Sequence, residues 1–128
     1  MKELKTSLRA PQPSGSYSQG IRWDNLLFTA GMGPTDPSTG RISGNSIEEQ
    51  TEQVLLNLQA LLEDQGLTLN DVLKATVHLS DLNDFTGFDR VYRRFFSPPY
   101  PVRTTVGSQL MGILVEIDFV CAYKSMNT

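Results

Sequence analysis

An arginine on a predicted β-strand is the residue of this sequence best suited to binding an anion. Residues 100–107 read YPVRTTVG, and valine, threonine and valine alternate there with Arg103, Thr105 and Gly107. Alternation of this kind is typical of a strand. A guanidinium group stays charged at physiological pH and presents a planar fork of donors that fits a carboxylate or a phosphate. The stretch therefore predicts an anion-binding side chain on one face of a strand.

Two acidic residues near the end of the chain are the predicted partners of this arginine. Glu116 and Asp118 alternate with apolar residues over residues 113–121, which predicts another strand. If the last two strands form a hairpin, one register sets Arg103 opposite Asp118. The same register sets Thr105 opposite Glu116, whereas the other register faces Arg103 with apolar side chains. Because opposite charges stabilise facing strands, we predict the first register.

Spacing alone leaves two interpretations of this constellation open. The first is a structural ion pair between strands, which contributes roughly 0.2–1 kcal/mol. The second is a small-molecule site, in which Arg103 binds an acid and Glu116 holds a water molecule or a proton. A charge-assisted hydrogen bond in such a site contributes roughly 1.5–3 kcal/mol.

The first half of the chain is predicted to form a hairpin, a loop and a long helix. Residues 17–31 read as two strands around an Asp-Asn turn, and residues 33–44 hold two prolines and three glycines, as loops do. Ser46 and Glu49 have the spacing of a capping box, and Gly66 supplies a stop. The expected inner face of the helix comprises Val54, Leu55, Leu58, Leu61 and Leu62.

The second half predicts a strand, an aromatic helix and the two strands already described. Residues 71–81 alternate in polarity, and their expected inner face comprises Leu73, Ala75, Val77 and Leu79. A helix is expected to begin near Asn83 and Asp84, and the prolines of residues 97–101 end it. Its expected inner face comprises Phe85, Phe88, Val91, Phe95 and Phe96. The predicted fold is α+β, in the order ββαβαββ, with two helices packed on one face of the sheet.

The uncovered face of this sheet is predicted to be polar. Thr76, His78 and Arg103 are assigned to it, and such side chains are too polar for the dry core of a monomer. The face meets either water or partner subunits across a wet interface, and we favour oligomerisation. We expect His78 to be a hydrogen-bonded interface residue rather than a catalytic base.

Composition sets bounds on compartment, cofactors and partners. The 128 residues fit one domain, residues 1–128, and their formal net charge of −3 gives no reason to expect nucleic acid or a membrane as a partner. The single cysteine, Cys121, excludes an intrachain disulfide and is expected to be a buried thiol. With one histidine, the usual zinc ligand sets cannot be assembled within one subunit. We expect no metal, no organic cofactor, no secretion signal and a cytoplasmic location.

Seven stretches of the sequence, taken in order, resemble those of one known family. They are YSQGI, FTAGMGPTDPSTG, QTEQVLLNLQALLEDQG, DVLKATVHLSDLNDF, VYRRFF, PVRTTV and VEIDFV, between residues 10 and 123. Over this span the chain is similar to the RidA/YjgF family of 2-iminoacid/enamine deaminases. The resemblance implies a chorismate-mutase-like subunit with a mixed sheet. It also implies a homotrimer with three active sites in the clefts between subunits.

The resemblance further implies roles for individual residues. Arg103 stands at the position that binds the substrate carboxylate, and Glu116 stands at the position that holds the attacking water. Tyr17 stands where a tyrosine helps to enclose the substrate. Ala30 and Gly31 belong to the FTAGM stretch of the same substrate-binding site.

Three positions depart from the pattern of the family. Ala30 replaces a usual serine, Thr105 replaces a frequent cysteine, and Asp89 replaces a usual asparagine. Asp89 and Thr105 are included among the expected substrate-binding residues. Because none of these departures removes Arg103 or Glu116, they bear on substrate range and rate more than on the type of reaction.

The candidate residues and the family resemblance lead to three alternative functions. The favoured one is hydrolytic deamination of reactive 2-imino acids and enamines, such as 2-aminoacrylate, to 2-keto acid and ammonia. The second is non-catalytic binding of small carboxylates, such as 2-keto acids or amino acids, by the same Arg103. The third is an RNA-directed activity, as a ribonuclease or translation inhibitor. The net charge, the single histidine and the lack of a basic-aromatic stripe disfavour the third.

Overall fold

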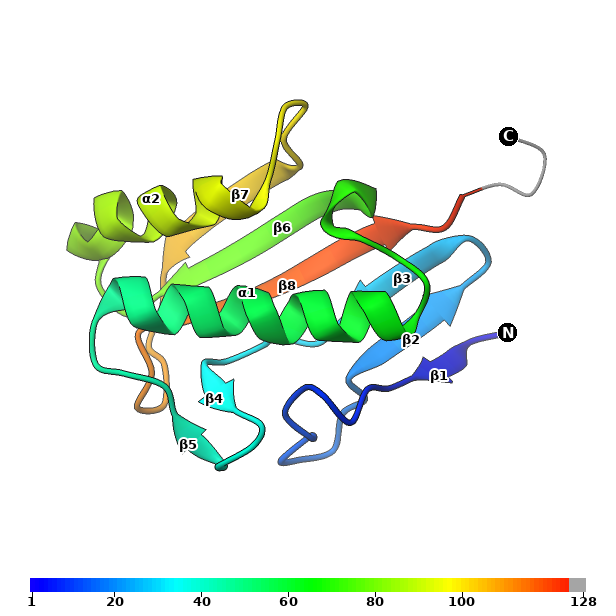
Figure 1. The fold of residues 1–128 in the computed structure, drawn as a ribbon, viewed down its shortest axis with the longest axis horizontal. Coiled ribbons are helices and arrows are strands. Elements are labelled where there is room, and N and C mark those ends of the chain that lie inside the picture. The colour runs from blue at the N-terminus through cyan, green and yellow to red at the C-terminus, as the bar shows by residue number, and fades with distance from the viewer. Residues whose placement is uncertain (125–128) are drawn as a thin grey trace.

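A mixed six-stranded sheet forms one layer of the structure, a computed structural model that describes residues 1–124 (Figure 1). Its strands are β1 (Glu3–Lys5), β2 (Gly20–Trp23), β3 (Leu26–Thr29), β6 (Val72–Leu79), β7 (Val102–Gly107) and β8 (Val115–Ala122). They lie in the order β1-β2-β3-β8-β6-β7. All neighbours are antiparallel except β6 and β7, which are parallel.

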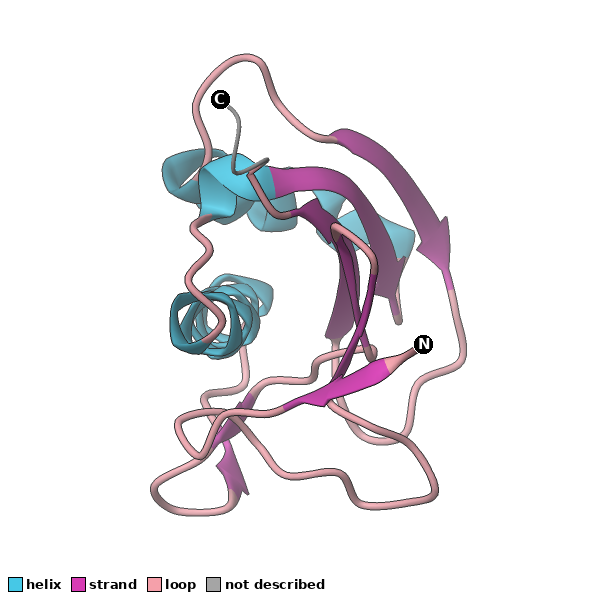
Figure 2. Cartoon of the chain, turned by 90° about the vertical axis from the view of Figure 1, so that its right-hand side faces the viewer, coloured by secondary structure: helices cyan, strands magenta, loops and turns pink. Residues whose placement is uncertain are grey.

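Two helices form the second layer, and Figure 2 shows both on the same side of the curved sheet. The helical elements are α1 (Ile47–Asp64), α2 (Phe85–Phe95) and the short 3-10 turns η1 (Leu69–Asp71) and η2 (Leu82–Asp84). This arrangement confirms the predicted ββαβαββ order, to which β1 adds an edge strand. The predicted loop over residues 33–44 contains a small pair, β4 (Thr35–Asp36) and β5 (Arg41–Ile42). None of the helices within residues 1–124 is both long and apolar enough to cross a membrane.

Helix α1 begins and ends where the sequence predicts. The Ser46 hydroxyl accepts a hydrogen bond from the Glu49 N–H at 3.1 Å, and the Glu49 carboxylate accepts one from the Ser46 N–H at 3.3 Å. These two bonds form the capping box. Gly66 follows the last turn with φ of 77°, a left-handed conformation that favours glycine. The fully buried residues of its inner face include Val54, Leu55, Leu58, Leu61 and Leu62, as predicted.

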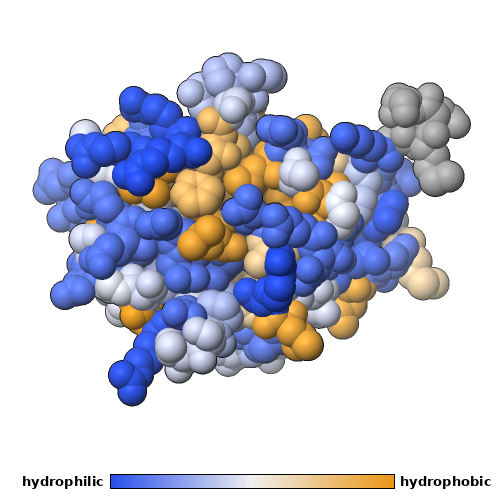
Figure 3. Space-filling model, in the orientation of Figure 1, coloured by the Kyte–Doolittle hydropathy of each residue, from blue (hydrophilic) through white to orange (hydrophobic). Residues whose placement is uncertain are grey.

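Helix α2 packs aromatic rings against the sheet. Phe88, Tyr92 and Phe96 form a run of contacts with ring centroids 5.4 and 4.6 Å apart, and Phe96 lies 6.0 Å from Phe119 of β8. Phe85, which was predicted in the core, is 39% exposed instead. It stands at the first turn of α2, where the centroid of its ring lies 5.4 Å from the guanidinium carbon of Arg103. Figure 3 shows hydrophobic residues gathered between the two helices, within a mostly hydrophilic face.

The predicted inner face of β6 is wrong at one residue, because the strand contains a β-bulge. The alternation predicted over residues 75–79 holds, but Leu73 is 50% exposed and Val72 is buried in its place. The bulge lies between Val72 and Lys74, where the register with β8 shifts. Because a bulge inserts one extra residue, it reverses the direction of the side chains that precede it.

The predicted hairpin of the last two strands is wrong. Strand β6 lies between β7 and β8, because β6, α2 and β7 form a unit in which a helix joins two neighbouring parallel strands. Arg103 is in register with Ala75 of β6, and Ala75 is opposite Phe119 of β8. Arg103 therefore does not face Asp118. The predicted pairing of Thr105 with Glu116 is wrong for the same reason, because Thr105 is in register with Val77 of β6.

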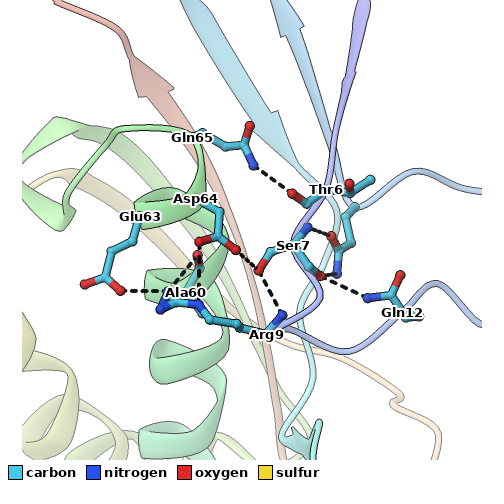
Figure 4. Close-up of polar contacts among 9 residues, drawn as sticks. Thr6, Ser7, Arg9, Gln12, Ala60, Glu63, Asp64 and Gln65 are labelled. Carbon is cyan, nitrogen blue, oxygen red and sulfur yellow. Dashed lines mark hydrogen bonds and ion pairs between the residues drawn. The ribbon is translucent and has the colours of Figure 1, made fainter.

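Polar side chains anchor the N-terminal segment to the end of α1 (Figure 4). Arg9 forms ion pairs of 2.8 and 3.5 Å with the last two acidic residues of α1. The Ser7 hydroxyl donates to Asp64. The buried Gln19 accepts from the Ser7 N–H at 2.7 Å and donates to the Pro11 carbonyl at 2.8 Å. These bonds fix the path of the chain that leads to Tyr17.

Candidate functional site

Arg103 lies on the helix-covered face of the sheet, not on the uncovered face where it was predicted. Its guanidinium carbon is 4.7 Å from the centroid of the Tyr92 ring and 5.3 and 5.4 Å from those of Phe88 and Phe85. These are the distances of cation–π contacts, which stabilise a charged side chain against an apolar wall. The side chain is 21% exposed. The rings therefore orient the guanidinium fork and leave part of it accessible.

A carboxylate of α2 binds one edge of this guanidinium. Asp89 Oδ1 accepts from Arg103 Nη1 at 2.8 Å, and Asp89 Oδ2 accepts from Arg93 Nη2 at 3.0 Å. Partial burial disfavours the charged form of Asp89, but the hydrogen bonds with the two arginines outweigh burial and hold the pKa of Asp89 below its ordinary value. Within residues 1–124, no second carboxylate forms an ion pair with Arg103.

The arginine and the aspartate border a cavity of about 470 Å³, whose lining residues are Asp89, Tyr92, Arg93, Tyr100, Pro101 and Arg103. The Tyr92 side chain is buried, and its hydroxyl has no hydrogen-bond partner among residues 1–124. Burial raises the pKa of Tyr92 to about 12, so the hydroxyl keeps its proton at neutral pH. The hydroxyl itself is shielded from solvent, and the neighbouring Arg103 guanidinium offsets part of the rise in its pKa.

A second cavity, of about 680 Å³, contains the other predicted site residues. Tyr17, Ala30, Gly31 and Glu116 all line it. Tyr17 is half-exposed, and its hydroxyl accepts from the Ser14 N–H at 3.2 Å. Within the described part of the chain, the Glu116 carboxylate forms no ion pair or hydrogen bond. Its oxygens are therefore open to a water molecule or a ligand.

Gly31 permits a close approach between the chain and Glu116. A Cβ atom at Gly31 would lie 2.8 Å from Glu116 Cδ, a distance that real side chains do not adopt. The next residue, Met32, is fixed beside β8 by two backbone hydrogen bonds with Ile117, of 2.7 and 3.1 Å. The FTAGM stretch therefore forms the wall against which the Glu116 carboxyl group rests.

A single chain does not bring Arg103 and Glu116 together. Arg103 and Thr105 share the helix-covered face of β7, whereas Glu116 of β8 is in register with His78 on the opposite face. The predicted site residues therefore divide into two sets. We call them the arginine group, which comprises Asp89, Arg103 and Thr105, and the glutamate group, which comprises Tyr17, Ala30, Gly31 and Glu116.

Three other reactive side chains lie outside these groups. The imidazole of His78 is hydrogen-bonded as predicted, with Nδ1 2.7 Å from Ser108 Oγ. Burial raises the pKa of Asp118, and the neighbouring His78 and Lys74 offset this only in part. Cys121 is the buried thiol that the sequence predicts, and burial raises its pKa to about 12. Among the described residues, no group of three or more His, Cys, Asp or Glu side chains is placed to hold a metal ion.

Sequence reasoning missed the aromatic residues that surround Arg103. It assigned Phe85 and Phe88 to the core and gave Tyr92 no role. A usable signal was the spacing of Asp89 and Tyr92, because residues three apart on a helix share a face. That signal becomes interpretable only when β7 is known to lie beside α2.

The fold and the two cavities together define a class of protein. Two helices on one face of a mixed sheet, in this strand order, form a chorismate-mutase-like α+β subunit. Residues 7–123 match the model of the family described as Endoribonuclease L-PSP, and the chain belongs to this family. The predicted resemblance to the Rid (RidA/YjgF) proteins is confirmed by relatives that carry that name.

Three relatives illustrate the similarity. A RutC family protein of Pyrococcus horikoshii is 45% identical over 126 residues, which cover 97% of this chain and 99% of that protein. Reactive Intermediate Deaminase A of Arabidopsis thaliana, a chloroplastic protein, is 36% identical over 94% of this chain and 64% of its own length. The crystal structure of E. coli TdcF with bound serine is 31% identical, with a TM-score of 0.89 over 95% of this chain and 99% of that one.

Proposed function

We propose that this protein is a hydrolytic deaminase that converts reactive 2-imino acids and enamines, such as 2-aminoacrylate, to 2-keto acids and ammonia. The observation that carries the proposal is the Arg103 guanidinium, which aromatic rings orient at a cavity and which only one carboxylate binds within residues 1–124. Its open edge suits a small carboxylate. The name of the Arabidopsis relative supports the same class of reaction.

The proposed chemistry needs one cation and one carboxylate. Arg103 binds the substrate carboxylate and thereby orients C2 for attack. Glu116 holds a water molecule and accepts its proton as the new C–O bond forms at C2. That proton passes to the nitrogen of the tetrahedral adduct, which becomes an amino group. The hydroxyl proton of the adduct then moves to the same nitrogen through solvent as the C=O bond forms and the C–N bond breaks, which releases ammonia and the 2-keto acid. An enamine first takes a proton at carbon, which gives the iminium ion, and then loses a proton from nitrogen to become the imine.

The geometry of the chain bears on how this site is assembled. Because Arg103 and Glu116 lie on opposite faces of one sheet, we propose that they reach the same substrate from different subunits. The arginine group of one chain then faces the glutamate group of the next in a homotrimer, as the family resemblance implies. In this assembly the half-buried polar residues of the uncovered face, such as His78, lie at the contact between subunits.

A second function, non-catalytic binding of small carboxylates, uses the same arginine. The bound serine of the TdcF structure supports it, because serine carries a carboxylate of the required size. The two functions differ in their products. An enzyme releases ammonia and a 2-keto acid faster than the uncatalysed reaction, whereas a binding protein does not.

The decisive experiment supplies freshly generated 2-aminoacrylate and measures the release of ammonia and 2-keto acid together. We expect the unmodified protein to accelerate both, and Arg103→Ala to return both to the uncatalysed rate with fold and oligomeric state intact. Arg90→Ala is a matched control, because it removes an exposed arginine of α2 that pairs with Glu48. Near-normal turnover by Arg103→Ala would contradict the proposal. Ligand binding without accelerated release would favour the binding function.

The family description, Endoribonuclease L-PSP, also names an activity on RNA. The net charge of −3 gives no electrostatic reason to expect the positively charged groove that RNA binding uses. We therefore expect RNA cleavage to disappear on stringent purification. Cleavage that persists in pure protein and is lost in Arg103→Ala would assign the arginine to RNA instead.

A further inference from the structure

Asp89 introduces a negative charge into a cavity that is otherwise built to bind an anion. We propose that Asp89 makes this cavity select ligands that carry both an acid and a protonated nitrogen over ligands that carry the acid alone. The inference rests on the proposed function, and it names the form of the substrate that the site prefers. That form is the iminium acid, a 2-imino acid with a proton on its nitrogen.

Asp89 weakens the attraction of this cavity for a ligand that carries an acid alone. Arg103 and Arg93 supply two positive charges, and Asp89 lies between them at 2.8 and 3.0 Å. A carboxylate that binds the open edge of Arg103 comes within a few ångströms of the Asp89 carboxylate. Like charges at this distance repel, and partial burial reduces the screening by water. A positive group on the ligand therefore offsets the aspartate, and such a ligand binds better than the acid alone.

The aspartate also has acceptor sites for that positive group. Each carboxylate oxygen has two lone pairs, and each oxygen of Asp89 accepts one hydrogen bond from an arginine within residues 1–124. The side chains of Asp89 and Arg103 are 26% and 21% exposed and line the same cavity. The nitrogen of an iminium acid lies two bonds from its carboxylate carbon. A ligand of this type therefore reaches both side chains at once.

The preference has a chemical consequence for hydrolysis. A neighbouring carboxylate favours the protonated form of a bound imine, which takes its proton from the solvent. Water adds to C2 of this iminium more readily, because the C=N electron pair moves to a nitrogen that is already positive. One proton of the added water then passes to the amino group and the other returns to the solvent, so that the C=O bond forms as the nitrogen leaves as ammonia. The 2-keto acid that remains has no N–H for Asp89. The product is therefore held less tightly than the substrate.

A matched pair of stable ligands tests the inference by titration calorimetry. 2-Aminobutanoate and 2-oxobutanoate share their carbon chain and carboxylate and differ in a protonated nitrogen against a carbonyl oxygen. We expect the unmodified protein to bind the amino acid about tenfold more tightly, the value of one hydrogen bond between charged groups. Asp89→Asn should abolish or reverse this preference, because the amide keeps the shape and the bond to Arg103 but loses the charge.

Two control variants complete the design. Asp84→Asn removes a carboxylate just before α2 that does not line the cavity, and it should keep the preference of the unmodified protein. Arg103→Ala should bind neither ligand, and this loss would show that both ligands bind at Arg103. An unchanged ratio in Asp89→Asn, or binding of neither ligand by the unmodified protein, overturns the inference. These readouts do not measure turnover, so a failed ammonia assay with an intact ligand preference would reject only the deaminase.

Discussion

Two carboxylates of this protein differ in what they contact. Asp89 lies between two arginines on α2, whereas Glu116 rests against a glycine backbone and contacts no cation within residues 1–124. The first is a counterion, and each of its oxygens already accepts one hydrogen bond from an arginine. The second keeps its oxygens free for a water molecule. The groups that surround each carboxylate, rather than the residue type, therefore distinguish a counterion from a residue that can hold water.

Substitution of Glu116 tests the role of the second carboxylate. We expect Glu116→Gln to lower the rate of 2-aminoacrylate hydrolysis by about 100-fold, since the loss of a positioned general base costs at least that much in many enzymes. Affinity for 2-oxobutanoate should change little, because Arg103 still binds the acid. Steady-state rates and calorimetry on the same preparation check this. An equal loss of rate and affinity would make Glu116 a structural residue.

The ion pair of Asp89 predicts a pH dependence of stability. Since the pKa of Asp89 in the folded protein lies below its ordinary value of 3.8, the pair stabilises the fold above that value. The contribution is lost as the pH falls through the lowered pKa, where the folded protein also takes up the proton. We expect Asp89→Asn to be less stable than the unmodified protein at pH 7, and the two to converge at an acid pH below the lowered pKa. Urea unfolding at both pH values measures the difference, and a gap that persists in acid would exclude the ion pair as its cause.

Among the helices and strands, neighbouring residues set the boundaries of α1, whereas contacts between distant segments position the arginine group. Helix α1 carries its own start, stop and apolar face, so its boundaries follow from neighbouring residues. The unit formed by β6, α2 and β7 positions the arginine group instead, because the helix brings Asp89 over the strand that carries Arg103. The site therefore depends on the packing of a helix on an edge strand.

The capping box of α1 gives a prediction at this scale. Ser46→Ala removes the hydroxyl that accepts from the Glu49 N–H, and we expect it to lower the free energy of unfolding by about 1 kcal/mol. Ser46→Asp should retain most of the stability, because its carboxylate accepts the same bond near a helix N-terminus. Urea unfolding of the three proteins checks the order. Equal stability of all three would show that the cap contributes nothing.

The whole molecule places the two groups of site residues on opposite faces of one sheet. A site that contains both Arg103 and Glu116 then requires two chains, whatever the details of their contact. This requirement makes the proposed trimer testable by mixing inactive variants.

We expect Arg103→Ala and Glu116→Gln chains, each inactive alone, to regain activity when they assemble together. In a mixed trimer with one site between each pair of neighbours, about a third of the sites combine an intact arginine with an intact glutamate. Co-expression with two affinity tags isolates the mixed trimers, and turnover of 2-aminoacrylate measures the recovery. Mixed assemblies as inactive as their parents would show that both residues must come from one chain.

Much of the fold was determined by the sequence itself, because the signals are local. The capping box at Ser46, the apolar stripe of α1, the buried strand ending at Leu79 and the prolines after α2 all act within a few residues. The same holds for the types of the candidate site residues. A guanidinium on an alternating strand predicts an anion site wherever the strand lies.

The neighbours of Arg103 were decided only by the tertiary structure. Charge complementarity favoured a hairpin with Asp118, but a strand that follows a crossover helix pairs with the strand before that helix, and so β6 separates β7 from β8. The arginine therefore faces α2, where it takes its counterion from Asp89 and its aromatic wall from Tyr92. Adjacency in a sheet depends on contacts between residues far apart in the chain, and no local pattern encodes which strands meet.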